Sequence, residues 1–134
     1  MNLSNERQDN LWEKTCFEAF IQPMDSKQYW EINVSPSGQW NVYHFQDRRQ
    51  SMKPESRMRV VKSQFQSLSS SSFSFQFEVD LSQALSNSPA TEVRVGLCTI
   101  LLHKDSTKSH WALAHKSPQA DFHDPQSFLL STAI

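Results

Sequence analysis

Seven side chains have the chemical types and the spacing to form a site for a small polar ligand. They combine aromatic rings with carboxylate, amide and imidazole groups: Trp12, Glu18, Glu31, Asn33, Trp40, His44 and Trp111. Sugars present apolar C–H faces beside hydroxyl groups, so a sugar site needs flat aromatic surfaces and paired hydrogen-bonding groups. These seven residues are therefore candidates for ligand binding. The competing interpretation is that some tryptophans only fill the core, which we expect for Trp30.

A second group of polar side chains lies near the C-terminus, where His115, Asp121, His123 and Asp124 occur in the segment "HKSPQADFHD". Imidazole and carboxylate groups suit a transition metal, but their spacing matches no tight zinc pattern and no thiol joins them. The sequence favours an irregular loop here and no metal site. The segments "QDRRQ" and "HKDST" are too poor in acidic residues to predict calcium binding.

Motifs of catalysis are absent from the sequence, which has no GxSxG elbow and no glycine-rich phosphate loop. Glu18 and Glu31 could in principle act as the acid and base pair of a glycosidase, in which the separation of the two carboxylates decides the outcome. Carboxylates on paired strands are more often solvated or hydrogen-bonded. We therefore expect a protein that is not an enzyme.

Length and charge restrict the class of protein. The 134 residues suit one domain, which we place at residues 11–134 behind a disordered or polar N-terminal extension at residues 1–10. The formal net charge of -1 argues against nucleic-acid binding. No apolar stretch approaches the roughly 18 residues of a membrane span, and no signal peptide is visible, so we expect a cytoplasmic protein with no membrane partner. Cys16 and Cys98 lie in apolar runs and are expected to be free core thiols.

Alternation with period two is the recurrent pattern of the chain, and it predicts an all-β protein. The expected strands are Cys16–Ile21, Tyr29–Ser35, Trp40–Phe45, Met58–Gln66, Phe73–Val79, Glu92–His103, Ser109–Ala114 and Ser127–Leu130. Short turns between them favour an antiparallel β-sandwich of jelly-roll or immunoglobulin-like type. One helical turn, capped by Asp80, is expected in "LSQAL".

The alternation also assigns the faces of the strands. Trp30, Ile32 and Val34 are expected to point into the core, and Glu31 and Asn33 to the outward or cleft-facing side. If the first two strands pair across "QPMDSKQ", Glu18 lies close to Glu31 or Asn33. "EVRVGLCTILLH" is apolar on both faces and predicts a central strand, in which Gly96 marks a bulge or a close backbone approach.

Three blocks of the sequence carry a family resemblance. "LWEKTCFEAFI", "YWEINVSPSGQWNVYHF" with "RRQSM" beyond it, and "HWALAHKSPQADFHDPQSF" together resemble the bacterial DOMON-like proteins related to family 9 carbohydrate-binding modules. The resemblance covers about Leu11 to Leu130. It implies a β-sandwich from a superfamily that binds sugars in some branches and haem in others. Members of the branch usually carry some tens of residues before the "LWE" block, so the chain is expected to lack N-terminal strand material.

The residues and the resemblance together predict a non-catalytic module that binds a small molecule or an oligosaccharide. One alternative is an interaction or structural domain whose exposed sheet edge pairs with another chain, as in a homodimer. Another is a haem-binding domain, because DOMON relatives use a Met and His axial pair. The chain offers Met24, Met52 and Met58 with five histidines, but no single pair is indicated.

Overall fold

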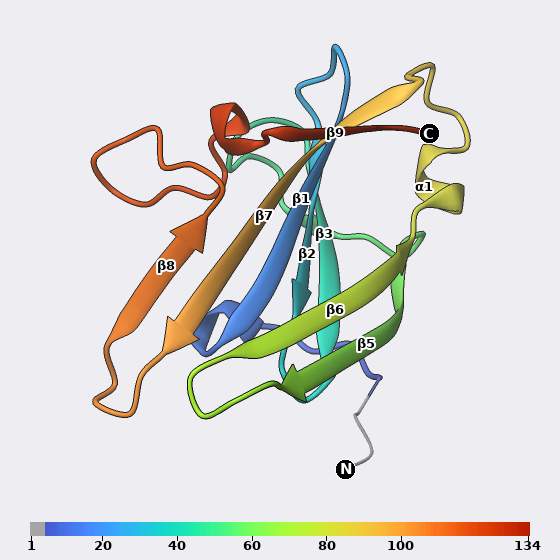
Figure 1. Cartoon of the computed structure of the whole chain (residues 1–134). Helices are drawn as coiled ribbons and strands as arrows, with labels where there is room; N and C mark the ends of the chain where they lie inside the picture. The colour runs from blue at the N-terminus through green and yellow to red at the C-terminus, as the bar shows by residue number, and fades with distance from the viewer. Residues whose placement is uncertain (1–4) are drawn as a thin grey trace.

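The computed structural model describes residues 5–134, and these residues form two antiparallel β-sheets (Figure 1). The larger sheet has seven strands, in the order β4-β3-β2-β1-β7-β8 with β9 paired to β7, and the smaller is the hairpin β5-β6. The strands are β1 (Cys16–Pro23), β2 (Tyr29–Val34), β3 (Trp40–Phe45), β4 (Lys53–Pro54), β5 (Arg59–Ser67), β6 (Phe73–Asp80), β7 (Glu92–Leu102), β8 (Lys108–Ala112) and β9 (Leu130–Ala133). The prediction of an all-β antiparallel sandwich is confirmed.

The expected C-terminal strand is shifted along the sequence. We expected it at Ser127–Leu130, but Pro125–Ser127 forms the short 3₁₀ helix η2 and β9 begins only at Leu130. Proline suits the first position of a helix, and the Asp124 side chain accepts a hydrogen bond from the Gln126 amide at 3.0 Å. Local capping chemistry therefore overrides the weak alternation of this segment.

β1 and β7 lie in the middle of the large sheet. β1 pairs with β2 on one side and with β7 on the other, and the outer side of β7 is shared by β8 and β9. The expectation that "EVRVGLCTILLH" is a central strand is confirmed. At the opposite edge, β3 is bordered by the two-residue β4 and by the segment Glu6 to Gln8, which hydrogen-bonds to the backbone of Trp40.

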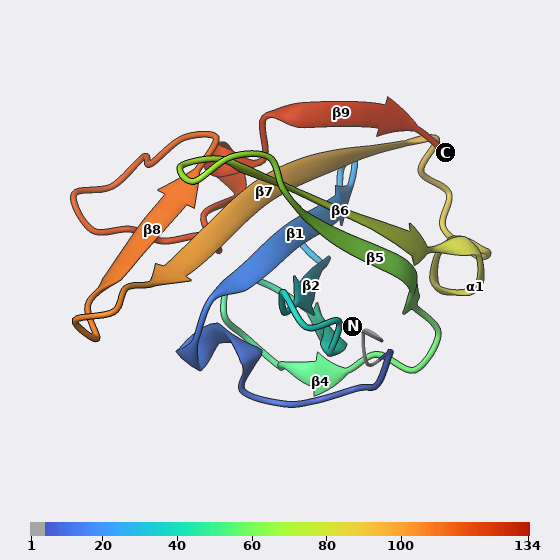
Figure 2. The same ribbon diagram turned by 60° about the horizontal axis from the view of Figure 1, so that its bottom comes forward.

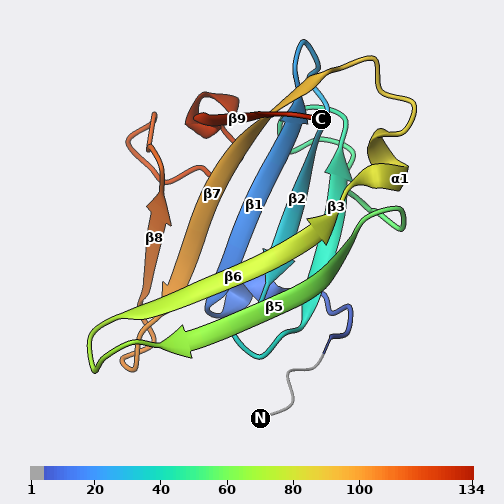
Figure 3. The same cartoon turned by 45° about the vertical axis from the view of Figure 1, so that its right-hand side comes forward.

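The β5-β6 hairpin closes one face of the large sheet. It runs obliquely across β7, β1, β2 and β3, and Figures 1 and 3 show it in front of those strands. Trp30, Ile32 and Val34 point toward it into an apolar core, as the alternation predicted. From the hairpin side, Phe75, Phe77 and Val79 pack against the same core. Two packed sheets thus exclude water from the part of this face that β1, β2 and β3 form.

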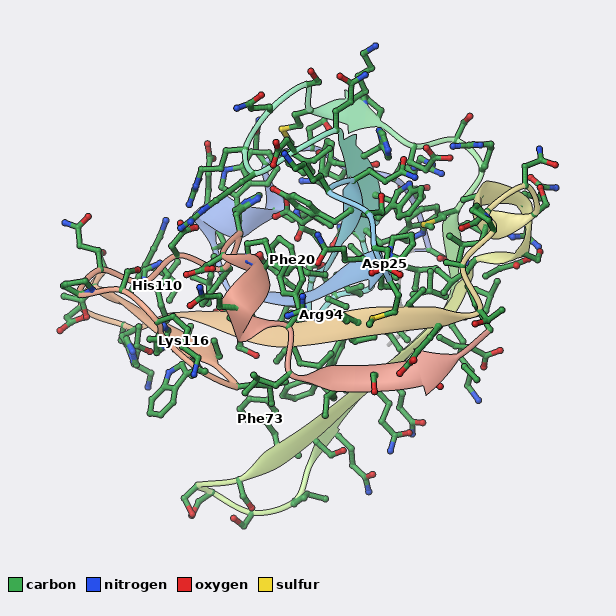
Figure 4. The ribbon with its side chains drawn as sticks, turned by 90° about the horizontal axis from the view of Figure 1, so that it is seen from above. Phe20, Asp25, Phe73, Arg94, His110 and Lys116 are labelled. Atoms are coloured by element: carbon green, nitrogen blue, oxygen red, sulfur yellow. The ribbon has the colours of Figure 1, made fainter. Side chains whose placement is uncertain are left out.

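Loops close the opposite face, on which residues 5–134 form no second sheet. Figure 2 shows the hairpin on one side of the large sheet, and Figure 4 shows Phe20 and Phe73 on opposite sides of β7. A second apolar cluster lies on this face: Phe20, Tyr29, Tyr43, Phe45, Cys98, Ile100, Phe122 and Phe128. This side of β2 was expected to be outward or cleft-facing; because every residue of β2 is buried and Glu31 lines a pocket, the cleft-facing alternative holds and the outward one does not.

Gly96 marks a close approach, as its position in a strand suggested. A Cβ atom at Gly96 would lie 2.6 Å from Cδ1 of Phe128, so only glycine admits the phenyl ring against the strand. Phe128 in turn stacks on Phe20, with 5.5 Å between the ring centroids. This contact holds the C-terminal loop against β1 and β7.

The remaining features are short. The expected helical turn is α1 (Ser82–Leu85), but the expected cap is wrong: the N-cap residue is Leu81, which has no side-chain cap hydrogen bond. Asp80 precedes it, and its Oδ1 accepts a hydrogen bond from the Ser82 amide at 3.0 Å. Cys16 and Cys98 are buried and unbridged. Among residues 5–134, no helix is long and apolar enough to span a membrane.

Candidate functional site

The candidate site lies on the loop-covered face of the large sheet. Strand register brings its polar groups together: Glu18 of β1 lies directly opposite Asn33 of β2 and opposite Cys98 of β7. Glu31, two residues before Asn33, points to the same face. The prediction that Glu18 lies beside Glu31 or Asn33 is therefore confirmed in its geometry.

Burial is the largest cause of the shifted pKa values of the two carboxyl groups in this site. Glu18 is 3% exposed, Glu31 5% and Asn33 0%. Burial, followed by the charge of Glu31, raises the pKa of Glu18 well above its usual range, and burial raises the pKa of Glu31 to about 7. The two carboxyl groups therefore hold a proton at neutral pH, because ionising both would place two like charges in a desolvated site.

Several atoms of this group have no hydrogen-bond partner within residues 5–134. They are Glu18 Oε2 and both amide atoms of Asn33, all inaccessible to solvent. A buried polar atom without a partner costs about 1–3 kcal/mol. Such unsatisfied atoms are uncommon in proteins. A cluster of them beside a pocket indicates that these atoms form hydrogen bonds with a ligand or with water.

His123 reaches this site from the C-terminal loop. Its Nδ1 lies 2.7 Å from the Tyr29 hydroxyl, which also accepts a hydrogen bond from the Arg49 amide at 3.0 Å. The Tyr29 proton is thus directed at Nδ1, which assigns the ring proton of His123 to Nε2, 3.8 Å from Glu31 Oε2. Burial and the charge of Arg49 lower the pKa of His123 to about 4, so the ring is neutral and this contact is not an ion pair.

Ion pairs hold two loops together over the site. Asp121 of the C-terminal loop accepts hydrogen bonds from Arg48 and from Arg49, the latter at 2.9 Å, and Asp124 lies 3.9 Å from Arg48. Burial of Asp121 opposes its ionisation, but the hydrogen bonds from the two arginines outweigh this effect and lower its pKa. These contacts link residues more than seventy positions apart in the chain.

Trp12 contributes the aromatic wall nearest the N-terminus. It lies in the 3₁₀ helix η1 (Leu11–Glu13) and meets the ring of Tyr43 edge to face, with centroids 5.8 Å apart. Asp9 fixes this helix to β3, because its carboxylate accepts hydrogen bonds from Tyr43 at 2.5 Å and from Asn41 at 2.9 Å. The ring of Trp12 is only partly buried and remains accessible from the pocket.

Together these groups enclose a pocket of about 390 Å³. Its lining residues are Trp12, Glu18, Glu31, Phe45, Arg49, Met52, Ile100, His110, Ala120, Phe122 and His123. Pockets for small ligands occupy about 300–1,000 Å³ and combine apolar walls with a few placed polar groups, and this pocket has both properties. No cluster of three or more His, Cys, Asp or Glu side chains within residues 5–134 is arranged to hold a metal ion.

The seven candidate residues from the sequence divide between regions. Trp12, Glu18 and Glu31 line the pocket, and Asn33 is fully buried opposite Glu18. Trp40 and His44 are elsewhere because they alternate with Tyr43 and point to the hairpin face. Trp40 is buried under the Arg7 guanidinium, 4.3 Å from the ring centroid. His44 Nε2 lies 2.9 Å from Gln28 Oε1.

Trp111 also lies away from the pocket. It pairs with Thr99 on β8, is 60% exposed, and its indole N–H donates to Ser109 Oγ at 2.9 Å. It borders a separate apolar groove with Phe17, Phe75 and Leu97. Its neighbour His110 points the other way, into the main pocket.

The sequence did not identify most of the remaining lining residues as one site. Phe45 and His110 could have been found from strand parity, since each alternates onto the face of Glu31 or Ile100. Arg49, Met52, Ala120 and Phe122 lie in loops and have no periodic signal. Within the tail group, His123 joins the pocket, Asp121 and Asp124 pair with arginine, and His115 stacks on Phe122 with centroids 6.2 Å apart.

Comparison with known proteins yields one structural match. No protein-family model and no curated protein matches the sequence. The fold is similar to the crystal structure of a candidate carbohydrate-binding protein from Bacteroides uniformis, with a TM-score of 0.63 and 13% sequence identity. The match covers 98% of this chain and 66% of that chain. At this level of identity the similarity establishes a shared β-sandwich fold.

Proposed function

We propose that the protein is a non-catalytic carbohydrate-binding module of DOMON-like, family 9 type, and that the sugar binds in the pocket formed by Trp12, Glu18, Glu31 and His123. The observation that carries the proposal is the combination, in one pocket, of a partly exposed tryptophan ring and buried carboxyl groups. An aromatic ring matches the C–H face of a sugar, and carboxyl and imidazole groups bond its hydroxyls.

Two further observations support a carbohydrate. The crystal structure with the similar fold is described as that of a candidate carbohydrate-binding protein. The sequence blocks that resemble family 9 modules contribute to this pocket, since "LWE" contains Trp12 and "YWEINV" contains Glu31. The resemblance and the pocket therefore point to the same part of the molecule.

A titration with saccharides tests the proposal. We expect cello-, xylo- or chito-oligosaccharides to change the tryptophan fluorescence and to release or absorb heat in calorimetry. Trp12→Ala should abolish or strongly weaken this binding, whereas Trp111→Phe, in the separate groove, should leave it unchanged. Binding that persists in Trp12→Ala would place the sugar elsewhere, and the absence of any saccharide binding would refute the function.

The non-catalytic part of the proposal is tested by incubation with aryl glycosides. Glu18 and Glu31 are neighbours on paired strands and hold a proton jointly, an arrangement that suits binding of a polar group. Release of the aryl alcohol by the wild type, lost in both Glu18→Gln and Glu31→Gln, would make the protein a glycosidase instead.

Haem binding is the second candidate function. It is favoured by one observation, that Met52 and His110 line the same pocket and offer a thioether and an imidazole. The buried carboxyl groups of Glu18 and Glu31 disfavour a ligand that carries negative propionates. A Soret band after addition of haemin, removed by Met52→Leu and by His110→Ala, would establish haem binding.

A further inference from the structure

The pair formed by Glu18 and Glu31 has more capacity for hydrogen bonds than the protein itself uses. Glu18 lines the pocket and is 3% exposed, yet its Oε2 has no partner among residues 5–134. Glu31 faces the same pocket, and its Oε2 lies 3.8 Å from Nε2 of His123. That separation is too long for a direct hydrogen bond. The pair therefore presents acceptor oxygens in a desolvated place.

Neighbouring groups do not neutralise this acidic pair. The titratable and charged groups that face it are Cys16 (β1), Tyr29 (β2), Tyr43 (β3), Arg49 (β3–β4 loop), Cys98 (β7), His110 (β8) and His123 (C-terminal loop). Burial raises the pKa of the thiols and of both tyrosines, and it lowers that of His123, so these five groups are neutral at pH 7.

The cations at the rim are already matched. Arg48 and Arg49 pair with Asp121, and Arg48 also lies near Asp124, so two positive charges face two negative charges. This rim cluster carries no net charge when all four groups are ionised. The charge that a ligand meets at the bottom of the pocket is therefore set mainly by Glu18 and Glu31.

Three kinds of ligand group could complete this pair: a hydroxyl, a metal ion or an ammonium group. A metal ion needs further protein ligands, and the described residues supply no cluster of three. A hydroxyl satisfies hydrogen bonds but leaves the shared proton in place. An ammonium group offers three donors and a positive charge, and charge-assisted hydrogen bonds are roughly twice as strong as neutral ones. The aromatic rings of Trp12, Phe45 and Phe122 in the walls also favour a cation.

We propose that Glu18 and Glu31 together bind a protonated amino group, so that the carbohydrate recognised by this pocket is an amino sugar. This inference rests on the proposed function and narrows its ligand. Binding of the ammonium form restores both carboxylates and expels the proton that they share. The proton passes to the buffer, the ligand stays charged, and no covalent bond forms or breaks.

Three disaccharides with the same β-1,4-linked backbone provide the test: chitobiose, which carries free amino groups, N,N′-diacetylchitobiose, which carries neutral acetamides, and cellobiose, which carries hydroxyls. Calorimetry at about pH 6.5 keeps an amine whose pKa is near 8 mostly protonated. Repeating each titration in two buffers of different ionisation enthalpy measures the protons released.

We expect chitobiose to bind at least about tenfold more tightly than either neutral disaccharide, the effect of one additional charge-assisted hydrogen bond. Its binding should release about one proton, and cellobiose binding close to none. Glu31→Gln and Glu18→Gln, which keep the side-chain volume, should each reduce the preference for the amine and the proton release. Trp111→Phe, outside the pocket, is the matched control and should change neither.

The outcomes separate the two proposals. Binding of cellobiose or N,N′-diacetylchitobiose with affinity equal to that of chitobiose overturns the inference and leaves the carbohydrate function intact. Chitobiose binding without proton release also overturns it, and this measurement on the wild type does not depend on how the variants fold. If none of the three binds, and longer oligosaccharides also fail, the proposed function itself is refuted.

Discussion

The two faces of the large sheet are both buried, yet different kinds of structure cover them. On one face the β5-β6 hairpin lies over Ile32 and Val42, and the contacts are apolar. On the other face, loops joined by Arg49 and Asp121 lie over Glu31, and a pocket of about 390 Å³ remains. Two regular sheets pack at interior density, whereas irregular loops leave room and polar atoms. The difference associates the apolar core with one face and the pocket with the other.

The largest effect that this comparison predicts is on stability at the hairpin face. Ile32→Ala removes buried methyl groups from the core beneath the hairpin and should lower the free energy of unfolding by about 2–5 kcal/mol. Saccharide affinity of the folded variant should stay unchanged, because the side chain points away from the pocket. Denaturant unfolding and calorimetry measure the two quantities. A change in affinity without a loss of stability would contradict the division between faces.

A smaller effect is expected at the adjacent residue on the other face. Between pH 4.5 and about 7 folded Glu31 keeps a proton that the unfolded chain releases, so this group destabilises the fold as the pH rises. Glutamine does not titrate, so Glu31→Gln removes this decrease in stability. The unfolding free energy of the variant should therefore rise relative to that of the wild type with increasing pH, by up to about 2–3 kcal/mol at pH 7.

The variant must be compared with the wild type at each pH, because His123 acts in the opposite sense. Its folded pKa of about 4 lies below the ordinary 6.5, so its contribution to stability rises with pH between these values. Subtracting the two unfolding curves cancels this term. If the difference in unfolding free energy between Glu31→Gln and the wild type does not change with pH, Glu31 does not hold a proton in the folded state, and the prediction is wrong.

A third prediction concerns affinity at the pocket face. Trp12→Ala removes a partly buried ring that packs edge to face on Tyr43, and it should weaken saccharide binding roughly fivefold to thirtyfold, about 1–2 kcal/mol. Its cost in stability should be below that of Ile32→Ala, because the ring is not fully buried. Isothermal calorimetry at 25 °C measures the affinity, and thermal unfolding provides the stability control.

The smallest effect is predicted for Trp111, which lies outside both buried regions. Since this side chain is 60% exposed, Trp111→Ala should change the unfolding free energy by no more than about 0.5 kcal/mol and leave pocket binding unaltered. Loss of saccharide affinity in this variant would show that the exposed groove on β8 takes part in binding.

Much of the fold could be predicted from the sequence because alternation is a local property. Successive side chains of a strand point to opposite faces wherever the strand lies, so Trp30 and Ile32 could be assigned to one face and Glu31 to the other. Trp40 and His44 were nevertheless grouped with the opposite face as site candidates. Residue type suggested a ligand, but their parity relative to Tyr43 places them against the hairpin.

The sequence alone determined the antiparallel strands and which side chains share a face, because both follow from the two-residue period of a strand. It also predicted that Glu18 lies close to Glu31 or Asn33, because a short loop connects their strands. Only the tertiary structure decided that the polar face of β2 is buried and faces a pocket. That result depends on contacts such as Arg49 with Asp121 and Tyr29 with His123, which join loops to positions 72 and 94 residues away. No local period records such contacts, because loops are positioned by the partners they meet after the strands have paired.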